Sequence, residues 1–280
     1  MFSPVNESTA QRMVAARDTA ARILDVDPAD DAVAWGWWGR SIGCLVEAKS
    51  GPAWLRVRSV PRGDGWGRIW EGNAAAVRAL PDTVRRPKLF TWHDFGIEEY
   101  DYRAEVSEYI TSQTCADDQF LREELDLPDE WWSSLRESLR ALSLVDAQDR
   151  TVVSQRYITR ALPHYLEAPE LPTTPPRWTT AHGDLHWANL TRLGPVLLDW
   201  ETWGTAPAGY DAAQLAAFTV FAPRTQQRLR RELSEFLDTP EGRFGELVVL
   251  SELLHMTTRG EHVEAANALR ERARELVEAL

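Results

Sequence analysis

The sequence predicts an α+β fold with two lobes: a small N-terminal lobe built on an antiparallel sheet, and a larger, mainly helical C-terminal lobe. Three observations support this prediction. The chain has 280 residues, which is long for a single hydrophobic core. Short apolar runs broken by Gly-rich turns lie between residues 33 and 110, as is typical of strands. From residue 127 onward, apolar residues recur at helical spacing. We place the lobe boundary after residue 107, which gives lobes of 1–107 and 108–280.

The N-terminal lobe is predicted to begin with a helix. Ser8-Thr9-Ala10-Gln11 has the form of a capping box, and apolar residues follow at helical spacing as far as Leu24. Turn residues, including Lys49-Ser50-Gly51-Pro52, then separate short apolar runs. The elements that follow the first helix are two strands, one helix and two more strands, over 33–48, 53–58, 69–80, 88–93 and 103–110.

The C-terminal lobe is predicted to be mostly helical. Leu135, Leu139 and Leu142 fall on one stripe of a helical segment that residues 127–132 open. A segment rich in Pro and Thr, residues 169–176, then interrupts the helical pattern. The remaining helices are expected over 153–166 and 212–221 and, by their period, within 224–280.

Composition excludes some classes of function. The formal net charge of −12 argues against nucleic acid as a partner, because phosphate backbones are bound by basic surfaces. Such a charge suits a cationic substrate, or it serves only solubility. Cys44 and Cys115 are too few for a disulfide framework, and no run reaches the ~18 apolar residues of a membrane span. We therefore expect a cytoplasmic protein without a membrane partner, as a monomer or homodimer.

One polar segment concentrates the residues suited to chemistry. It runs from Ala181 to Leu190 as AHGDLHWANL and continues, after a Gly194-Pro195 turn, into Leu198-Asp199-Trp200-Glu201. We expect the hairpin to direct Asp184, Asn189 and Asp199 into one volume. A carboxylate can orient an attacking hydroxyl, while an amide oxygen and a second carboxylate can bind magnesium. The spacing matches the kinase pattern H-R-D-x-x-x-x-N, with Gly183 in the Arg position.

These residues, together with Pro207-Ala208-Gly209-Tyr210-Asp211, resemble the aminoglycoside phosphotransferase/choline kinase-like family. The resemblance implies a bilobal protein-kinase-like fold that uses ATP and Mg²⁺. It also implies transfer of the γ-phosphate to an alcohol group of a small molecule, an antibiotic among the options. By this resemblance Asp184 is the catalytic residue and Asn189 and Asp199 bind the metal. The implied supports of the site are His182, His186 and Asp211.

The N-terminal lobe departs from the family pattern at one position. In the family, a Lys on the strand after the first hairpin holds the nucleotide phosphates, and the register places Arg56 there. Either Arg56 or Arg58, on the same strand face, takes this role, or the phosphates are held by other groups and both arginines are solvated strand residues. Glu71 is expected either to form an ion pair with the strand arginine or to be a solvated residue that interacts with the helix dipole. The segment Glu108-Tyr109-Ile110 resembles the hinge at which the backbone reads adenine, so Glu108 and Ile110 are expected at the ATP site.

The acceptor is less well defined. Glu201 and Trp203 follow the metal-binding Asp199 closely, and a carboxylate with an indole suits a cationic or sugar-like ligand. Acidic residues of the last helices either add an acidic wall or belong to solvated helix faces; they are Glu232, Glu235, Glu246, Glu252 and Glu261.

Other interpretations stay open. A His-x-Asp-x-His run, here His182, Asp184 and His186, is also typical of a metal-dependent hydrolase. The polar residues could alternatively serve only as turn and capping groups. Finally, an Arg in the Lys position is compatible with a pseudokinase that binds nucleotide or a small ligand without transferring phosphate.

Overall fold

The computed structural model describes residues 3–64, 67–147 and 149–279. The chain divides into two compact units. The first comprises Met1–Val77 and Arg86–Thr111, and the second comprises Arg78–Arg85 and Ser112–Leu280. The first contains an antiparallel sheet and the second is mainly helical, which confirms the predicted α+β class. No helix in the described part of the chain is long and apolar enough to cross a membrane.

The first unit is organised around a six-stranded sheet with the order β1-β3-β4-β6-β5, and β2 pairs with β3 at its edge. Every pairing is antiparallel. The register places Arg56 opposite Glu105 and Arg58 opposite Arg103, so two charged pairs lie side by side at the centre of the sheet. The strands are β1 (Asp27–Pro28), β2 (Ala34–Trp35), β3 (Ser41–Ala48), β4 (Gly51–Pro61), β5 (Leu89–Ile97) and β6 (Tyr100–Glu108).

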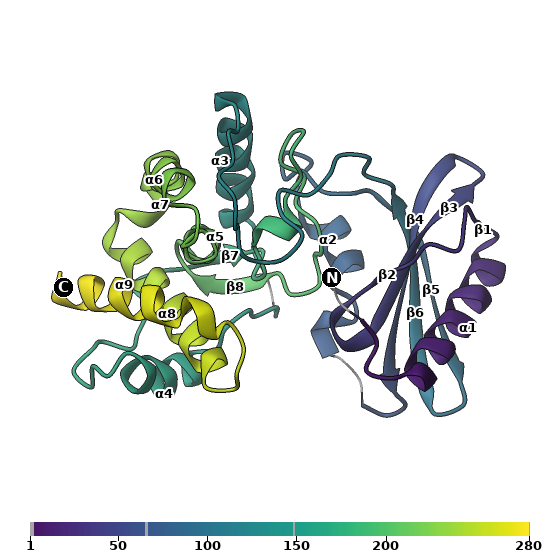
Figure 1. Ribbon diagram of the computed structural model, residues 1–280, viewed down its shortest axis with the longest axis horizontal. Helices are drawn as coiled ribbons and strands as arrows, with labels where there is room; N and C mark the ends of the chain where they lie inside the picture. Colours follow the sequence, from purple (N-terminus) through teal and green to yellow (C-terminus); the bar gives the residue numbers. More distant parts are fainter. Residues whose placement is uncertain (1–2, 65–66, 148, 280) are drawn as a thin grey trace. The chain divides into compact units, whose positions relative to one another are not determined.

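Helix α1 (Glu7–Leu24) covers one face of this sheet (Figure 1). Its buried residues, such as Met13 and Ala16, share a core with Leu55 and Val57 of β4. Because side chains alternate along a strand, Trp54, Arg56 and Arg58 project from the opposite face. The helix starts one residue earlier than predicted, since the Asn6 side chain accepts the Thr9 N–H at 2.8 Å. The cap is thus Asn6, and the capping box predicted at Ser8 is wrong.

Helix α2 (Gly72–Ala79) is shorter than the predicted 69–80, because a 3₁₀ turn, η2 (Gly67–Ile69), precedes it. Glu71 therefore lies just before the helix. Its side chain is exposed.

The second unit is arranged around α8 (Pro240–Thr257), which packs against α4, α5 and α9 (Figure 1). Its buried residues lie on all sides of the helix, as expected for a central helix. The other helices of this unit are α3 (Asp129–Ser143), α4 (Gln155–Tyr165), α5 (Tyr210–Ala217), α6 (Pro223–Glu232), α7 (Ser234–Leu237) and α9 (Ala266–Glu278), with short 3₁₀ turns at η3 (Trp187–Asn189) and η4 (Val263–Ala265). A further 3₁₀ turn, η1 (Trp37–Gly39), belongs to the first unit.

A two-stranded antiparallel sheet, β7 (Trp178–Ala181) with β8 (Gly204–Pro207), frames the polar segment identified in the sequence. The pairing joins Ala181 to Gly204, so residues 182–203 form a loop whose two ends are fixed beside each other. Within that loop, Leu190 and Leu197 form an isolated antiparallel bridge. The backbone carrying the candidate site is thus closed twice by main-chain pairing.

Candidate active site

The loop after β7 brings Asp184 and Asn189 together through His186. The Asn189 Nδ2 donates to the Asp184 carbonyl oxygen at 2.9 Å and lies 3.2 Å from His186 Nε2. The same imidazole nitrogen lies 3.7 Å from Asp184 Oδ2. The Asp184 side chain is 37% exposed and His186 is buried, so the carboxylate is open to a ligand while its neighbour is fixed.

His182 joins this loop to the strand segment that carries Asp199. Its Nδ1 accepts the Asp184 N–H at 3.3 Å, so its Nε2 carries the proton and donates to the Leu198 carbonyl oxygen at 2.8 Å. The Leu198 N–H in turn donates to the Asn189 carbonyl oxygen at 2.9 Å. Leu198 precedes Asp199 directly, so these two contacts fix where Asp199 leaves the hairpin.

Two backbone positions in the loop have left-handed conformations. Gly183 has φ +83°, and a Cβ atom there would meet a Val152 methyl group at 2.7 Å. This explains a glycine where protein kinases have arginine, because an L side chain would be both strained and crowded. Asp199 has φ +63°, a conformation that Asp tolerates better than most residues but that still costs free energy.

Helix α5 supports the loop from below through Asp211 and Gln214. The Asp211 carboxylate accepts the backbone N–H groups of His182 at 2.7 Å and Gly183 at 3.0 Å. Gln214 accepts the Leu185 N–H at 3.0 Å. Burial raises the pKa of Asp211 even though these two hydrogen bonds favour its charged form. The N-cap residue of α5 is Gly209, and no side chain caps this helix. Asp211, in the first turn of α5, binds the backbone of the loop and does not cap its own helix.

Arg150 organises the segment after Asp199. Its guanidinium donates to the carbonyl oxygens of Glu201 at 2.7 Å and Trp203 at 2.8 Å, and lies 4.7 Å from the centre of the Trp203 ring. Trp203 is only 2% exposed. This burial favours a structural role for Trp203 over the expected contact with substrate. The Glu201 side chain is only half-buried, so part of it is accessible to a ligand.

The donor set of the loop fits a hard cation. The Nδ2 group of Asn189 makes both of its hydrogen bonds as described, and no described residue donates a hydrogen bond to its Oδ1. An amide oxygen and the Asp199 carboxylate are ligands that Mg²⁺ prefers. A zinc-type cluster is not formed: His182 Nε2 is bonded to a carbonyl group, and the described residues contain no group of three His, Cys, Asp or Glu placed to hold a metal.

The first unit contains a buried ion pair that the sequence interpretation missed. Arg58 donates to Glu105 Oε1 at 2.9 Å, and to the carbonyl oxygens of Ile69 and Trp70, both at 3.0 Å. Asn73 of α2 donates to the other Glu105 oxygen at 2.6 Å. The partner of this strand arginine is thus a residue of β6.

Glu71 is therefore not the partner of Arg58. Glu71 is exposed and forms no ion pair with the described residues. The helix is fastened to the sheet by the neutral Asn73 instead. Glu105 was recognisable only as a charged residue in an apolar strand pattern, where Ala104 and Val106 flank it.

The end of β6 carries the predicted hinge residues. Glu108 pairs with the backbone of Lys88: the Glu108 N–H donates to the Lys88 carbonyl oxygen at 2.8 Å, and Glu108 Oε2 accepts the Lys88 N–H at 3.2 Å. Tyr109 lies over Trp54 of β4 with ring centres 6.2 Å apart. Ile110 is half-buried and lies just beyond the strand.

Most of the acidic residues proposed for the acceptor site form ion pairs with arginines. Glu232 pairs with Arg136 and Arg228, Glu235 with Arg140, and Glu246 with Arg230 and Arg272. Glu252 differs, because it accepts a hydrogen bond from the Tyr210 hydroxyl at 2.5 Å and forms no ion pair with an arginine among the described residues. Burial raises the pKa of Glu252 to about 7. Tyr210 adjoins Asp211, so Glu252 is tied to the helix that supports the catalytic loop.

Comparison with known proteins agrees with this geometry. A family model described as "Phosphotransferase enzyme family" matches residues 40–244. Aminoglycoside phosphotransferase APH(4)-Ia is similar in structure, with a TM-score of 0.62 and 14% identity over 98% of this chain and 99% of that chain. A thermostable mutant of it, solved with ADP and hygromycin B, has a TM-score of 0.64 and 13% identity over 94% and 98%.

A microcompartment-associated aminopropanol kinase is similar as well, with a TM-score of 0.54 and 16% identity over 93% of this chain and 95% of that chain. No curated protein sequence matches the chain. At these identities the structural likeness establishes the fold, which is the protein-kinase-like fold predicted from the motifs.

Proposed function

Because the chain belongs to the phosphotransferase enzyme family, we propose that it is an ATP- and Mg²⁺-dependent small-molecule kinase that transfers the γ-phosphate to an alcohol group. One observation carries the proposal. Asp184 and Asn189 are joined through His186, and the backbone of Leu198 fastens Asp199 to the same loop. A base, an amide oxygen and a second carboxylate are the groups that phosphoryl transfer needs.

Asp184 would accept the hydrogen bond of the acceptor hydroxyl and take its proton as the phosphoryl group arrives. Its partly exposed carboxylate is free to meet a ligand, whereas the backbone beneath it is fixed by His182 and Asp211. A strong base is not required, because in a loose transition state most of the acceleration comes from alignment and charge neutralisation.

Asn189 and Asp199 would hold the magnesium ion, which when bound neutralises the charge on the nucleotide phosphates. The fixed Asn189 amide presents its oxygen because its nitrogen is already used twice. The rigid approach to Asp199 through Leu198 keeps the second ligand in place without a substrate.

We assign the place of the phosphate-holding Lys to Arg56. Arg58 is only 7% exposed, and its guanidinium donates hydrogen bonds to two carbonyl groups and to Glu105. Arg56 projects from the same face of β4, lies opposite Glu105 in the register and is half-buried. Backbone groups between Glu108 and Ile110 would read the adenine, so the side chains there matter little to affinity.

The acceptor is a small molecule with a hydroxyl group, and Glu201 is the residue best placed along the chain to contact it. A cationic acceptor would suit the net charge of −12. The similar proteins include an enzyme crystallised with hygromycin B and an aminopropanol kinase, so aminoglycosides and amino alcohols are the first candidates. The proposal includes a reducing, cytoplasmic location, which suits the two unpaired cysteines.

The test is a coupled assay of ADP release with Mg-ATP over aminoglycosides, amino alcohols, sugars and nucleosides. Asp184→Asn is compared with Asp238→Asn, an exposed carboxylate in a turn of the same unit. Acceptor-dependent ADP release that disappears only in Asp184→Asn supports the kinase. Phosphorylation that persists in this variant refutes the role of Asp184.

The pseudokinase alternative is supported by the arginine at the lysine position. It predicts that Mg-ATP raises the melting temperature of the protein while no acceptor stimulates ADP release. Absence of both a thermal shift and turnover would contradict each of the two functions.

A further inference from the structure

Strand β5 forms one edge of the sheet of the first unit, and β6 is the only strand that pairs with it in the described chain. Successive residues of a strand direct their N–H and C=O groups to alternate sides, so about half of these groups point away from β6. No described residue outside β6 forms a hydrogen bond with the backbone of β5. The sheet therefore ends in an open hydrogen-bonding edge.

The side chains along this edge are exposed as well. Five consecutive residues of β5, 90–94, are exposed. Phe90 is 48% exposed and Trp92 is 45% exposed, although both are large and apolar. Apolar side chains beside an open strand edge form a template for pairing with another chain, which monomeric proteins normally avoid.

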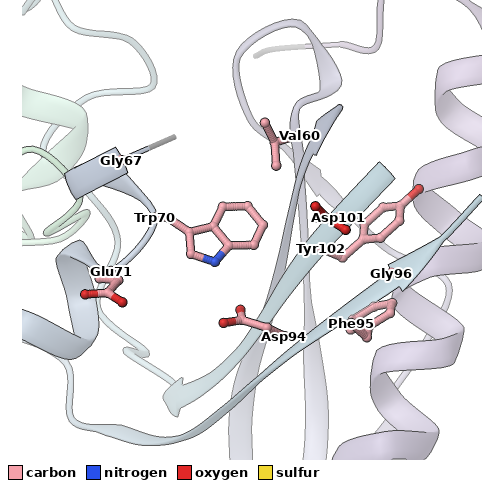
Figure 2. A pocket seen from close by; sticks show the side chains of 9 residues that line it. All are labelled: Val60, Gly67, Trp70, Glu71, Asp94, Phe95, Gly96, Asp101 and Tyr102. Atoms are coloured by element: carbon pink, nitrogen blue, oxygen red, sulfur yellow. The ribbon is translucent and has the colours of Figure 1, made fainter. Parts of the chain in front are cut away.

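The usual devices that protect a strand edge are mostly missing. Such edges commonly carry Lys or Pro, but β5 contains neither, and its only charged residue is Asp94. The Arg103 guanidinium neutralises Asp94 with two hydrogen bonds of 2.7 Å. Figure 2 shows Asp94 and Phe95 projecting from opposite faces of β5, so this charge lies over a face of the sheet and not along its edge. One irregularity, a register shift between Leu89 and Thr91, leaves residues 91–97 in regular pairing.

A second copy of the same strand fits this edge. A two-fold axis between two antiparallel strands pairs the central residue with its own counterpart. His93 is the middle residue of β5, so an axis at His93 pairs the whole strand and places Leu89 opposite Ile97 of the other copy. Asp94 then faces Trp92 of the other copy, and no two like charges are opposed. An axis at Asp94 would oppose two carboxylates, which is unfavourable.

The charges beyond the two ends of β5 are complementary in this arrangement. Lys88 precedes the strand and Glu98 follows it; both are exposed. Neither forms an ion pair with any residue that the structure describes. In antiparallel pairing the start of one strand lies beside the end of the other, so Lys88 of each copy approaches Glu98 of the other. These two opposite-charge contacts favour a second copy over a strand of unrelated sequence.

We propose that the chain forms a two-fold symmetric homodimer in which β5 pairs antiparallel with β5 of a second copy, centred on His93. The two sheets then become one continuous sheet. A contact of this kind belongs to the small interfaces, so the dimer dissociates in the micromolar range. The proposal does not depend on the kinase chemistry, because none of the residues assigned to that chemistry belongs to β5.

The experiment is sedimentation velocity of the full chain over a series of concentrations, which separates the 31.8 kDa monomer from a dimer of twice that mass. The wild type is compared with His93→Lys, His93→Asp and the neutral control His93→Gln. His93 is exposed, so these variants should fold, and thermal unfolding checks this. At the centre of a two-fold interface each charged variant opposes two like charges. An equimolar mixture of His93→Lys and His93→Asp opposes unlike charges instead.

We expect the wild type and His93→Gln to dimerise alike, and each charged variant to dimerise at least about fivefold more weakly. The mixture should form more dimer than either charged variant alone. Hydrogen exchange at the amides of β5 in the wild type should slow as the dimer forms. The proposal is overturned by a wild type that stays monomeric, by a charged variant that dimerises as well as the wild type, or by a mixture that forms no more dimer than its components.

Discussion

Arg58 and Glu105 form an ion pair at 2.9 Å in the middle of the sheet of the first unit, and both side chains are less than a tenth exposed. Glu105 has a second partner, Asn73 of α2, at 2.6 Å. One strand glutamate thus holds both the arginine of β4 and the start of the neighbouring helix. The helix contributes an amide where the family pattern led us to expect a glutamate.

Removing Glu105 should therefore destabilise the protein strongly. Glu105→Ala leaves the Arg58 guanidinium buried without its anion, and we expect the free energy of unfolding to fall by about 3 kcal/mol. Urea titration followed by circular dichroism measures this change. Glu47→Gln, on the exposed surface of the same sheet, should leave it within about 0.5 kcal/mol. A Glu105→Ala protein as stable as the wild type would show that the pair contributes nothing.

Substitutions of Arg56 and Arg58 should have different effects, one on nucleotide binding and the other on stability. If Arg56 holds the nucleotide phosphates, Arg56→Ala weakens Mg-ATP binding about tenfold or more with little loss of stability. Arg58→Ala should lower stability instead, because the buried Glu105 carboxylate would lose its cationic partner and keep only the neutral Asn73. Titration calorimetry with Mg-AMP-PNP and thermal unfolding give the two readouts. Unchanged nucleotide affinity in Arg56→Ala would remove this assignment.

Features that depend on residues close together in the sequence could be predicted, whereas features that depend on distant residues could not. The loop containing Asp184 and Asn189 was recognisable because its residues lie within a few positions of one another. The Glu105 pair was not, because it joins β4, β6 and α2 and depends on a register that no local pattern contains. Trp203 was judged by closeness along the chain, whereas its burial depends on Arg150, some fifty residues earlier.

Asp211 should control the geometry of the catalytic loop. Asp211→Ala removes the acceptor of two backbone N–H groups, so the segment from His182 to Asp184 loses its support. We expect kcat to fall at least about 100-fold through misplacement of Asp184. Hydrogen exchange at the His182 and Gly183 amides should become faster at the same time. Unchanged exchange alongside a reduced kcat would point to a role other than support of the backbone.

Glu252 should make stability depend on pH. Burial raises its pKa from 4.5 to about 7, so the folded protein binds this proton more tightly than the unfolded chain does. The resulting stabilisation is complete below the unfolded pKa and is lost as the pH rises through about 7.

Glu252→Gln cannot titrate and keeps an acceptor for the Tyr210 hydroxyl. Its unfolding free energy should exceed that of the wild type by up to roughly 3 kcal/mol above the folded pKa, at 1.36 kcal/mol per pKa unit. Urea titrations at several pH values give the two curves. If they run parallel between about pH 5 and pH 8, Glu252 does not titrate in this window.

Removal of Asp184 and removal of Asp199 should affect different steps, turnover in the first case and Mg-ATP binding in the second. Asp184→Ala removes the group that orients the acceptor hydroxyl, so turnover is lost while the affinity for Mg-ATP stays nearly intact. Asp199→Ala removes a ligand of the metal, so Mg-ATP binding itself weakens. Titration of both variants with Mg-AMP-PNP, beside their turnover with a competent acceptor, separates the effects. An equal loss of nucleotide affinity in both would contradict this division, since Asp184 would then contribute to binding the metal or its phosphates.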